Sequence, residues 1–196
     1  MSSQLPADIA AKLADLYARM VEAYDRVAKQ LDFTCEGCPD NCCDSFFHHH
    51  TYVEWAYLWE GVHGLPEEQQ QELVARAERH VEASETAMGR GERPQVMCPL
   101  NDHGLCSLYR HRLMICRMHG VPSSLTRPDG KTLHFPGCFR CQELTVGRND
   151  LPVVDRTSFY RELVDLEIAF LGPRRHILPK VSMTLARMLT AGPPTL

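Results

Sequence analysis

The 196-residue chain has no long apolar run and no excess of positive charge. No stretch approaches the roughly 20 apolar residues that cross a bilayer, so we expect no membrane contact. Residues 1–14 lack the basic start and apolar run of a signal peptide, which predicts a cytoplasmic protein. The formal charge of −4 argues against a nucleic-acid partner, because Lys and Arg contacts to phosphates supply most of the affinity of nucleic-acid modules.

The signatures of several enzyme classes are missing too. The chain contains no Gly-x-Gly-x-x-Gly dinucleotide motif, no P-loop and no nucleophile elbow. It also lacks the Cys-x3-Cys-x2-Cys pattern of radical methyl transfer. No substrate pocket is therefore indicated, and whether the protein is an enzyme stays open, as does any protein partner.

Against these absences stand nine cysteines, all between residues 35 and 141. A chain of 196 residues, 44% of them hydrophobic, buries a core without covalent cross-links, so the thiols are not needed as disulfides. Their odd number also argues against a complete disulfide framework. Thiolates this dense are typical of soft-metal sites. The candidate metal ligands are Cys35, Cys38, Cys42, Cys43, Cys98, Cys106, Cys116, Cys138 and Cys141.

The spacing of the thiols favours one pairing. Two C-x2-C pairs are present, Cys35/Cys38 and Cys138/Cys141. Each pair places two sulfurs on one turn within reach of a single ion, and two pairs make a four-sulfur site when the fold joins them. The adjacent Cys42 and Cys43 do not easily chelate one ion, which leaves open which of them is a ligand. Nine thiols furnish two four-ligand centres with one left over, or one centre plus structural cysteines such as Cys116.

Apolar residues at helical spacing predict a mainly α fold, a single domain over residues 1–196. One or two short β-hairpins carry the cysteine-ligated centre within residues 35–141. A turn at Asn101–Gly104 brings Cys98 and Cys106 together, and Pro128–Gly130 joins the second hairpin. Thr51 and Glu54 fit a capping box. The expected helices begin near residues 6, 51, 66, 107, 157 and 179 and end near residues 31, 61–64, 88, 119, 171 and 191.

Local charge also bears on the thiols. Cys106 is expected just before the helix that starts at Ser107, where the partial positive charge of the helix end favours the thiolate. A basic cluster follows it, formed by Arg110, His111, Arg112, Arg117 and His119. We interpret this cluster either as one solvated helix face or as positive charge that offsets a thiolate-ligated centre.

A resemblance to a known family is carried by Cys98-Pro99-Leu100-x4-Leu105-Cys106-Ser107-Leu108-Tyr109-x6-Cys116-Arg117 and by the upstream Cys35…Cys42-Cys43 cluster. This part of the chain resembles the CxxCxxCC family of zinc- or iron-chelating domains, the YkgJ-like cysteine-cluster proteins. The match covers residues 35–141. It departs from the family in the three residues between Cys38 and Cys42 and in His111–Met114, which replaces an Arg-Pro step.

The resemblance implies a cysteine-ligated metal or iron–sulfur centre in a bacterial cytoplasmic protein. Flagellin lysine methylases share the cysteine pattern and are associated with an iron–sulfur cluster. The surplus of thiols, the nearby cations and this likeness favour an iron–sulfur cluster, most simply 4Fe-4S. Two C-x2-C pairs that close one tetrahedral site favour the alternative, zinc.

The histidines are weaker candidates. His48, His49 and His50 precede the helix cap at Thr51, and consecutive residues point in different directions, so at most two of them converge on one ion. His119 follows Cys116 by three residues, which suits a fourth ligand or a residue that supports one. His103 and His134 fall in hairpins and are expected at the surface.

Three functions follow from these observations. The first is a metal-binding protein with a redox, sensing or structural role. The second is an enzyme of the protein-methyltransferase or redox type, which requires a pocket beside the centre; Tyr52, Trp55 and Trp59 could line one, although their helical spacing favours core packing. The third is a thiol–disulfide oxidoreductase, and against it neither C-x-x-C pair is expected to open a helix after a strand in a βαβ pattern.

Overall fold

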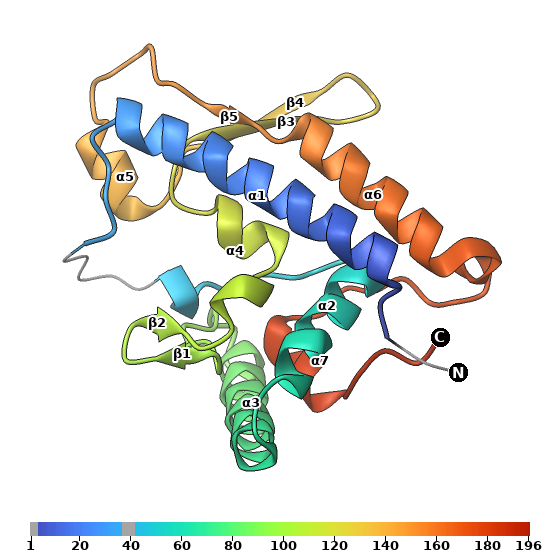
Figure 1. Cartoon of the computed structure of the whole chain (residues 1–196). Helices are drawn as coiled ribbons and strands as arrows, with labels where there is room; N and C mark the ends of the chain where they lie inside the picture. Colours follow the sequence, from blue (N-terminus) through green and yellow to red (C-terminus); the bar gives the residue numbers. More distant parts are fainter. Residues whose placement is uncertain (1–3, 37–41) are drawn as a thin grey trace. The chain divides into compact units, whose positions relative to one another are not determined.

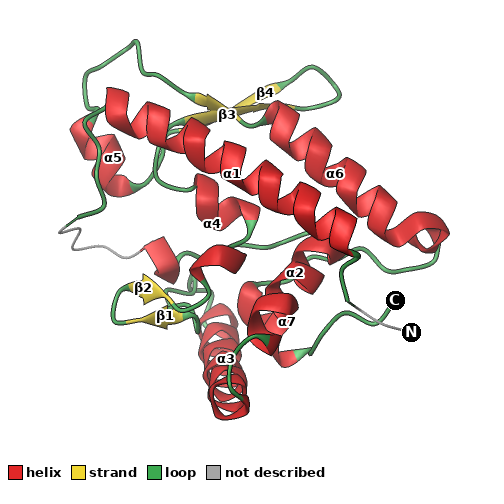
Figure 2. Cartoon of the chain, viewed as in Figure 1, coloured by secondary structure: helices red, strands yellow, loops and turns green. Residues whose placement is uncertain are grey.

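The computed structural model describes residues 4–36 and 42–196, and of Cys42 the backbone alone. Its order of elements is mainly helical, with short strands between the helices, as Figures 1 and 2 show. This confirms the mainly α class. The chain divides into two compact units. Unit 1 comprises residues 1–10, 43–113 and 167–196, and unit 2 comprises residues 11–42 and 114–166.

Unit 1 is built on helices α2 (Tyr52–His63), α3 (Glu67–Gly89) and α7 (Leu185–Thr190). Helix α3 packs along α7, as Figure 1 shows, and an ion pair between Arg187 and Glu85 joins them. The indole Nε1 atoms of Trp55 and Trp59 donate hydrogen bonds of 3.1 and 3.0 Å to the carbonyl oxygen of Met188. Both Trp side chains of α2 are therefore fixed against α7, which confirms a packing role.

The start of α2 is held by side chains as well as by the backbone. Thr51 caps the helix, since its hydroxyl accepts a hydrogen bond of 3.4 Å from the backbone N–H of Glu54. The carboxylate of Glu167 accepts bonds of 2.9 and 2.8 Å from the N–H groups of Tyr52 and Val53. These bonds satisfy N–H groups that have no partner within the helix. The predicted cap at Thr51 is confirmed.

Gly61 lies inside α2 and does not end it, contrary to the sequence-based expectation; Gly64 is the C-cap. A Cβ atom at Gly61 would lie 2.5 Å from Cγ of His111, whose ring packs on Tyr57 at 4.7 Å between centroids. The missing side chain therefore makes room for the 3-10 helix η2 (Tyr109–His111) against α2.

Unit 1 also contains the first predicted hairpin. Strand β1 (Asn101–Asp102) pairs antiparallel with β2 (Leu105–Cys106). His103 and Gly104 form the two-residue turn with φ of 49° and 89°, as a type I′ turn requires. The remaining elements of this part of the chain are the 3-10 helices η1 (Cys42–Asp44) and η3 (Gly172–His176).

Unit 2 combines helices with a small mixed sheet. Strand β3 (Ser123–Thr126) pairs antiparallel with β4 (Thr132–Phe135), which confirms the second hairpin, and parallel with β5 (Val154–Asp155). Helices α4 (Met114–Met118) and α5 (Phe139–Leu144) flank the β3–β4 hairpin in the sequence.

Helices α1 (Ala7–Gln30) and α6 (Thr157–Leu171) continue from one unit into the other along the chain. Their unit 2 portions are joined by an ion pair between Arg19 and Glu162. The apolar stripe of α1 is buried as predicted, with Leu13, Leu16 and Met20 fully inaccessible to solvent.

Two expected helices are wrong. The segment 107–119 is not one helix: η2 and α4 are separate, Arg112 between them is extended, and the boundary of the two units follows Leu113. The last helix starts at Leu185 and not near residue 179. Residues before it are extended because Met183 forms a β-bridge with His49, and Thr184 then caps α7.

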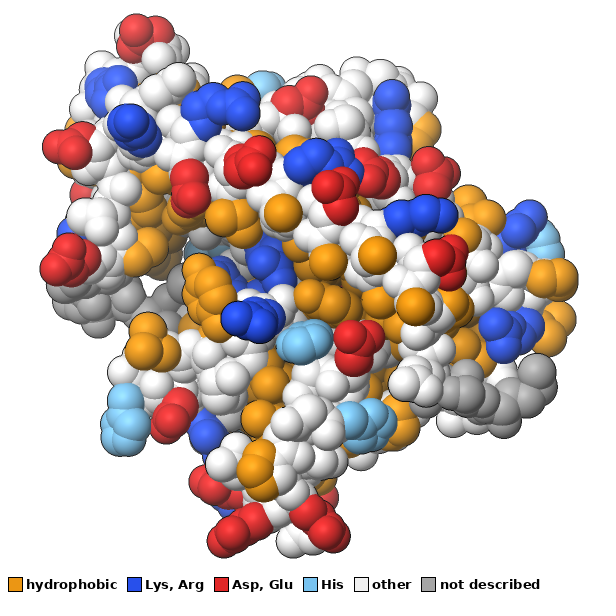
Figure 3. Space-filling model, in the orientation of Figure 1, with side chains coloured by type: hydrophobic (Ala, Val, Ile, Leu, Met, Phe, Trp, Pro, Cys, Tyr) orange, Lys and Arg blue, Asp and Glu red, His pale blue; other side chains and the backbone are white. Residues whose placement is uncertain are grey.

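None of the helices within the described residues is both long enough and apolar enough to traverse a lipid bilayer. On the face displayed in Figure 3, acidic and basic side chains are interspersed.

Candidate metal centre

The described cysteines are distributed over both units. Cys38 lies outside the described residues, as does the side chain of Cys42. Unit 1 holds Cys43, Cys98 and Cys106. The cysteines described in unit 2 are Cys35, Cys116, Cys138 and Cys141. Cys35 of the first C-x2-C pair and both cysteines of the second therefore belong to unit 2, and the downstream hairpin cysteines belong to unit 1.

Backbone hydrogen bonds gather the cysteine-bearing segments of unit 1. The N–H of Cys98 donates a bond of 2.9 Å to the carbonyl oxygen of Cys43, more than fifty residues earlier. The N–H of Asn101 donates a hydrogen bond, also of 2.9 Å, to the carbonyl oxygen of Cys98, and Asn101 pairs with Cys106 across the hairpin. The predicted turn between Cys98 and Cys106 is confirmed, and Cys43 is added to the same neighbourhood. All three side chains are half-buried.

Asn101 is the residue that shapes this hairpin. Its side-chain Oδ1 accepts a 3.1 Å bond from the N–H of Gly104, and its carbonyl accepts a bond from Arg76 of α3. Its Nδ2 atom is buried and has no hydrogen-bond partner among the described residues. The sequence identified Asn101 as a turn former alone.

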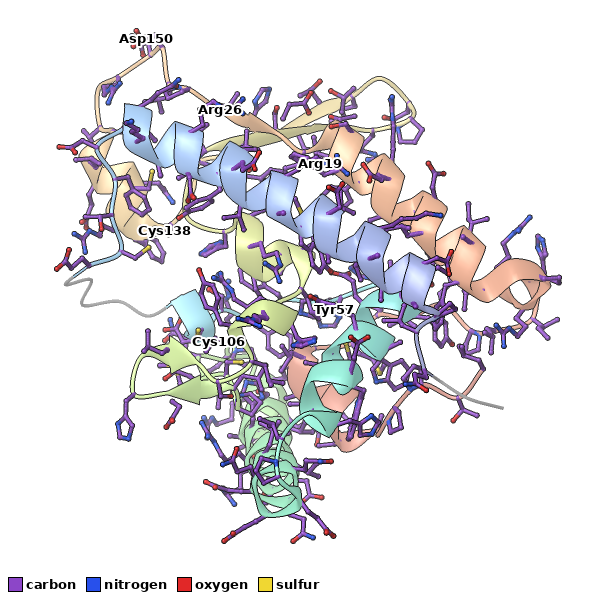
Figure 4. The ribbon with its side chains drawn as sticks, viewed as in Figure 1. Arg19, Arg26, Tyr57, Cys106, Cys138 and Asp150 are labelled. Atoms are coloured by element: carbon purple, nitrogen blue, oxygen red, sulfur yellow. The ribbon has the colours of Figure 1, made fainter. Side chains whose placement is uncertain are left out.

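In unit 2 the second C-x2-C pair opens a helix. Cys138 is the N-cap of α5, and its carbonyl accepts the first helical bond, 2.9 Å from the N–H of Gln142. Cys141 lies in the first turn. Residues three apart on a helix have Cβ atoms about 5–6 Å apart, so both thiols are near each other. The Cys138 thiol makes no capping hydrogen bond. Figure 4 labels Cys138 at the start of α5.

A close backbone approach holds this pair in place. The N–H of Cys138 donates a 3.0 Å bond to the carbonyl of Gly120, four residues beyond Cys116. A Cβ atom at Gly137 would lie 2.5 Å from that carbonyl oxygen, and Gly137 has a φ of 91°. Glycine at 137 is therefore required both by space and by backbone conformation. Sequence reasoning missed α5 and this glycine.

The first C-x2-C pair is represented by Cys35, which is exposed. Next to it, the carbonyl of Glu36 accepts a 3.0 Å hydrogen bond from Nη1 of Arg140 in α5. Arg140 lies between Cys138 and Cys141 in the sequence. This bond fixes the chain beside Cys35 to the turn that carries the second pair.

The two thiols of the second pair have different environments. Cys141 is fully buried, with 0% of its surface exposed, whereas Cys138 is half-buried. Burial, and to a smaller extent the neighbouring Cys138, raise the pKa of Cys141 to about 11. At neutral pH the Cys141 thiol is therefore protonated, and a metal ion that binds there must displace that proton.

Within residues 4–36 and 42–196, no three His, Cys, Asp or Glu side chains are grouped so that they could hold one metal ion. The described geometry thus supplies a thiol pair on one helical turn, Cys138 with Cys141. It also places Cys106 opposite Asn101 in the hairpin, and Asn101 is hydrogen-bonded to Cys98. A centre with four ligands would need further thiols in addition to such a pair. Among the described residues, no third thiol is grouped with the pair.

The structure corrects two sequence-based expectations, one about the charge near Cys106 and one about the basic cluster. Cys106 ends strand β2 and is not followed directly by an α-helix, so the expected helix-end charge beside it is wrong. The basic cluster is not one helix face either, since Arg112 lies in unit 1 and Arg117 in unit 2. These two guanidinium groups lie over aromatic rings instead, Arg112 over Tyr109 at 4.9 Å and Arg117 over Tyr17 at 4.3 Å.

The histidines differ widely in placement. His103 has 98% of its side chain exposed in the β1–β2 turn, and His134 is exposed on β4, so both predicted surface positions are confirmed. His119 follows α4, bonded through its N–H to Ile115 at 3.0 Å. His49 is buried, and burial lowers its pKa against the opposing effect of the Glu54 carboxylate.

A small hollow lies beside the C-x2-C segments of unit 2. It has a volume of about 250 Å³. Its lining residues are Asp32, Phe33, Thr34, Arg140, Glu143 and Leu144. Pockets for small-molecule ligands usually measure about 300–1,000 Å³. The hollow is smaller than that range, whereas one of about 470 Å³ in unit 1, lined in part by Trp59 and Glu67, falls within it.

Comparisons of the chain with protein-family models, with curated proteins and with solved structures found no match.

Proposed function

We propose that this protein binds a soft metal centre through its clustered cysteines, with Cys138 and Cys141 as the central pair and Cys35 and Cys38 as their partners. The observation that carries the proposal is the C-x2-C turn of α5, whose two neighbouring thiols form no disulfide with the other described cysteines. The bond from Arg140 to Glu36 supports the choice of partners, because it brings the first C-x2-C segment to the second.

Thiolate ligands select soft or borderline metals, and an iron–sulfur cluster or zinc fits four of them. Bound at these cysteines, zinc would supply a closed structural site, and an iron–sulfur cluster would supply electron transfer or sensing. The chain's own contribution is to hold two thiols on one turn, to bury one of them, and to anchor the neighbouring segment through Arg140. We favour the iron–sulfur cluster, on the surplus of thiols and the resemblance stated above.

The test is the content of iron, zinc and acid-labile sulfide, with a visible absorption spectrum, for protein purified without oxygen. Wild-type protein should contain metal, and Cys138→Ala and Cys141→Ala should each lose most of it and unfold at lower temperature. Cys106→Ala, the same substitution in the other unit, shows whether the loss is specific to unit 2. Unchanged metal content in both unit 2 variants would refute the proposal.

A second candidate is thiol–disulfide exchange by Cys138 and Cys141. The pair opens a helix that follows a strand, because β4 ends at Phe135 and α5 begins at Phe139. The strands on either side of α5 do not form a βαβ unit, as expected, because β4 pairs antiparallel and β5 pairs parallel with β3. In such a reaction the Cys138 thiolate attacks a partner's disulfide and releases one partner thiol. Cys141 then displaces the second partner thiol, so the pair is oxidised to a disulfide and the partner is reduced.

This candidate ranks second because the displacing thiol must be ionised. Burial raises the pKa of Cys141 to about 11, so this thiol is protonated at neutral pH. Metal-stripped protein that stays folded and reduces a model disulfide would favour exchange, whereas unfolding on chelation would favour the metal centre.

A further inference from the structure

The segment His48–His50 is extended and alternates in exposure. His49 is buried, and its backbone forms two hydrogen bonds with Met183, of 2.7 and 3.1 Å. Side chains of an extended segment point alternately to opposite faces, so His48 and His50 share the face opposite His49. Both are exposed. The bridge to the 181–183 segment therefore decides which two of the three histidines lie together.

Each exposed ring is oriented by a hydrogen bond at the same nitrogen. His50 Nδ1 lies 3.2 Å from the carbonyl oxygen of Val181, which can only accept, so Nδ1 of His50 carries the hydrogen. His48 Nδ1 lies 3.0 Å from the hydroxyl oxygen of Ser182. An imidazole whose Nδ1–H is bound in this way presents the lone pair of Nε2. This is the usual arrangement of a metal-binding histidine.

The two rings are also within reach of one ion. Their centroids are 6.5 Å apart, with an angle of 34° between the ring planes. A metal–nitrogen bond of about 2 Å puts each ring centre roughly 3 Å from the ion, so two rings that share an ion at a tetrahedral angle have centroids roughly 5 Å apart. The rings must therefore approach each other by roughly 1.5 Å, and exposed side chains reach this by rotation about χ1 and χ2.

We propose that His48 and His50 form a two-imidazole site for a borderline divalent transition-metal ion, such as Ni²⁺ or Zn²⁺, on the surface of unit 1. It is independent of the cysteine centre proposed above, since it uses nitrogen ligands and none of the thiols. Imidazole is the preferred protein ligand of this class of ion. Two protein ligands leave further coordination positions for water or for a donor group of another molecule.

The experiment is a Ni²⁺ titration of the full chain, with the first coordination shell read by X-ray absorption. Nitrogen and sulfur ligands differ there, so Ni²⁺ on the thiols is recognised. The variants are His48→Asn and His50→Asn, because the Asn amide nitrogen can replace Nδ1 as a hydrogen-bonding group and keep the bridge to 181–183. His103→Asn is the matched control, an exposed histidine of the same unit.

We expect the wild type to bind one Ni²⁺ with nitrogen ligands, and each of His48→Asn and His50→Asn to weaken that binding at least tenfold. His103→Asn should bind like the wild type. Ser182→Ala removes the hydrogen-bond partner of His48 Nδ1 and should weaken Ni²⁺ binding by roughly tenfold. This is the smallest loss usually seen when a residue that orients a metal ligand is removed.

Three results would overturn the site: wild-type Ni²⁺ affinity in either His variant, an equal loss in His103→Asn, or sulfur ligands around the bound Ni²⁺. Iron and acid-labile sulfide contents measured on the same variants separate this result from the cysteine centre. They should stay at the wild-type level in His48→Asn even when the Ni²⁺ site is lost.

Discussion

The two units hold their cysteines by different means. In unit 2, Cys138 and Cys141 sit on one helical turn, and one thiol is fully buried. In unit 1, Cys98 and Cys106 flank a short hairpin and both are half-buried. Near this hairpin Leu105 and Tyr109 have 74% and 60% of their surfaces exposed. A helical turn fixes the spacing of two thiols locally, whereas the hairpin depends on Asn101 and on contacts with distant segments.

The largest expected effect comes from the close approach that positions the unit 2 pair. Gly137→Ala places a Cβ 2.5 Å from the Gly120 carbonyl at a φ of 91°, which should cost about 2 kcal/mol or more in the free energy of unfolding. Metal content should fall with it. Gly130→Ala is the control, with a φ of 82° but no atom within 4 Å. Equal melting temperatures for the two variants would show that the close approach is unimportant.

Unit 1 has a corresponding tight contact away from its cysteines. Gly61→Ala brings a Cβ to 2.5 Å from the His111 ring, and η2 must shift. We expect a loss of about 1–3 kcal/mol in chemical denaturation, as for other overpacked sites. Metal content should change less than in Gly137→Ala, because Gly61 contacts none of the paired thiols. Gly64→Ala, at the C-cap, places a Cβ 3.3 Å from the carbonyl oxygen of Gly61 and should cost less. A greater metal loss in Gly61→Ala than in Gly137→Ala would reverse the comparison of the units.

Glu167 gives unit 1 a pH dependence of its own. Burial, chiefly, raises the pKa of Glu167 above its ordinary value, and the nearby Glu54 adds to the shift. The folded state then binds this proton more tightly than the unfolded state. The stabilisation is complete below about pH 4.5 and is lost as the pH rises through the higher folded-state pKa. In Glu167→Gln, the decline of unfolding free energy above pH 4.5 should be shallower, measured by urea denaturation. An unchanged slope would contradict this assignment.

The smallest effect is expected at the link between the two C-x2-C segments. Arg140→Ala removes the hydrogen bond to the Glu36 carbonyl and should change stability by about 1 kcal/mol or less. Metal affinity should nevertheless fall severalfold, because Cys35 is no longer held beside α5. Arg148→Ala, exposed beyond the same helix, is the matched control. Competition with a metal chelator measures the difference, and equal affinities would mean that Arg140 does not position the first pair.

The longer helices could be predicted because their signals are local. Apolar spacing located α1, α3 and α6, and Thr51 located the start of α2. The expected helix through 107–119 failed because the chain passes there from one unit to the other, and no local signal marks such a boundary. The single-domain organisation and the metal chemistry stay predictions.

The sequence by itself determined which residues carry chemistry: nine thiols in a defined order, and three consecutive histidines. It also determined the tight turns, since Gly104 and Asn101 act within a few residues. Only the tertiary structure decided that Cys43 is hydrogen-bonded to Cys98, and that His48 and His50, rather than His49, share an exposed face. The reason is physical: these arrangements depend on hydrogen bonds such as His49 to Met183 and Cys98 to Cys43, between residues far apart in the chain, and local spacing carries no information about them.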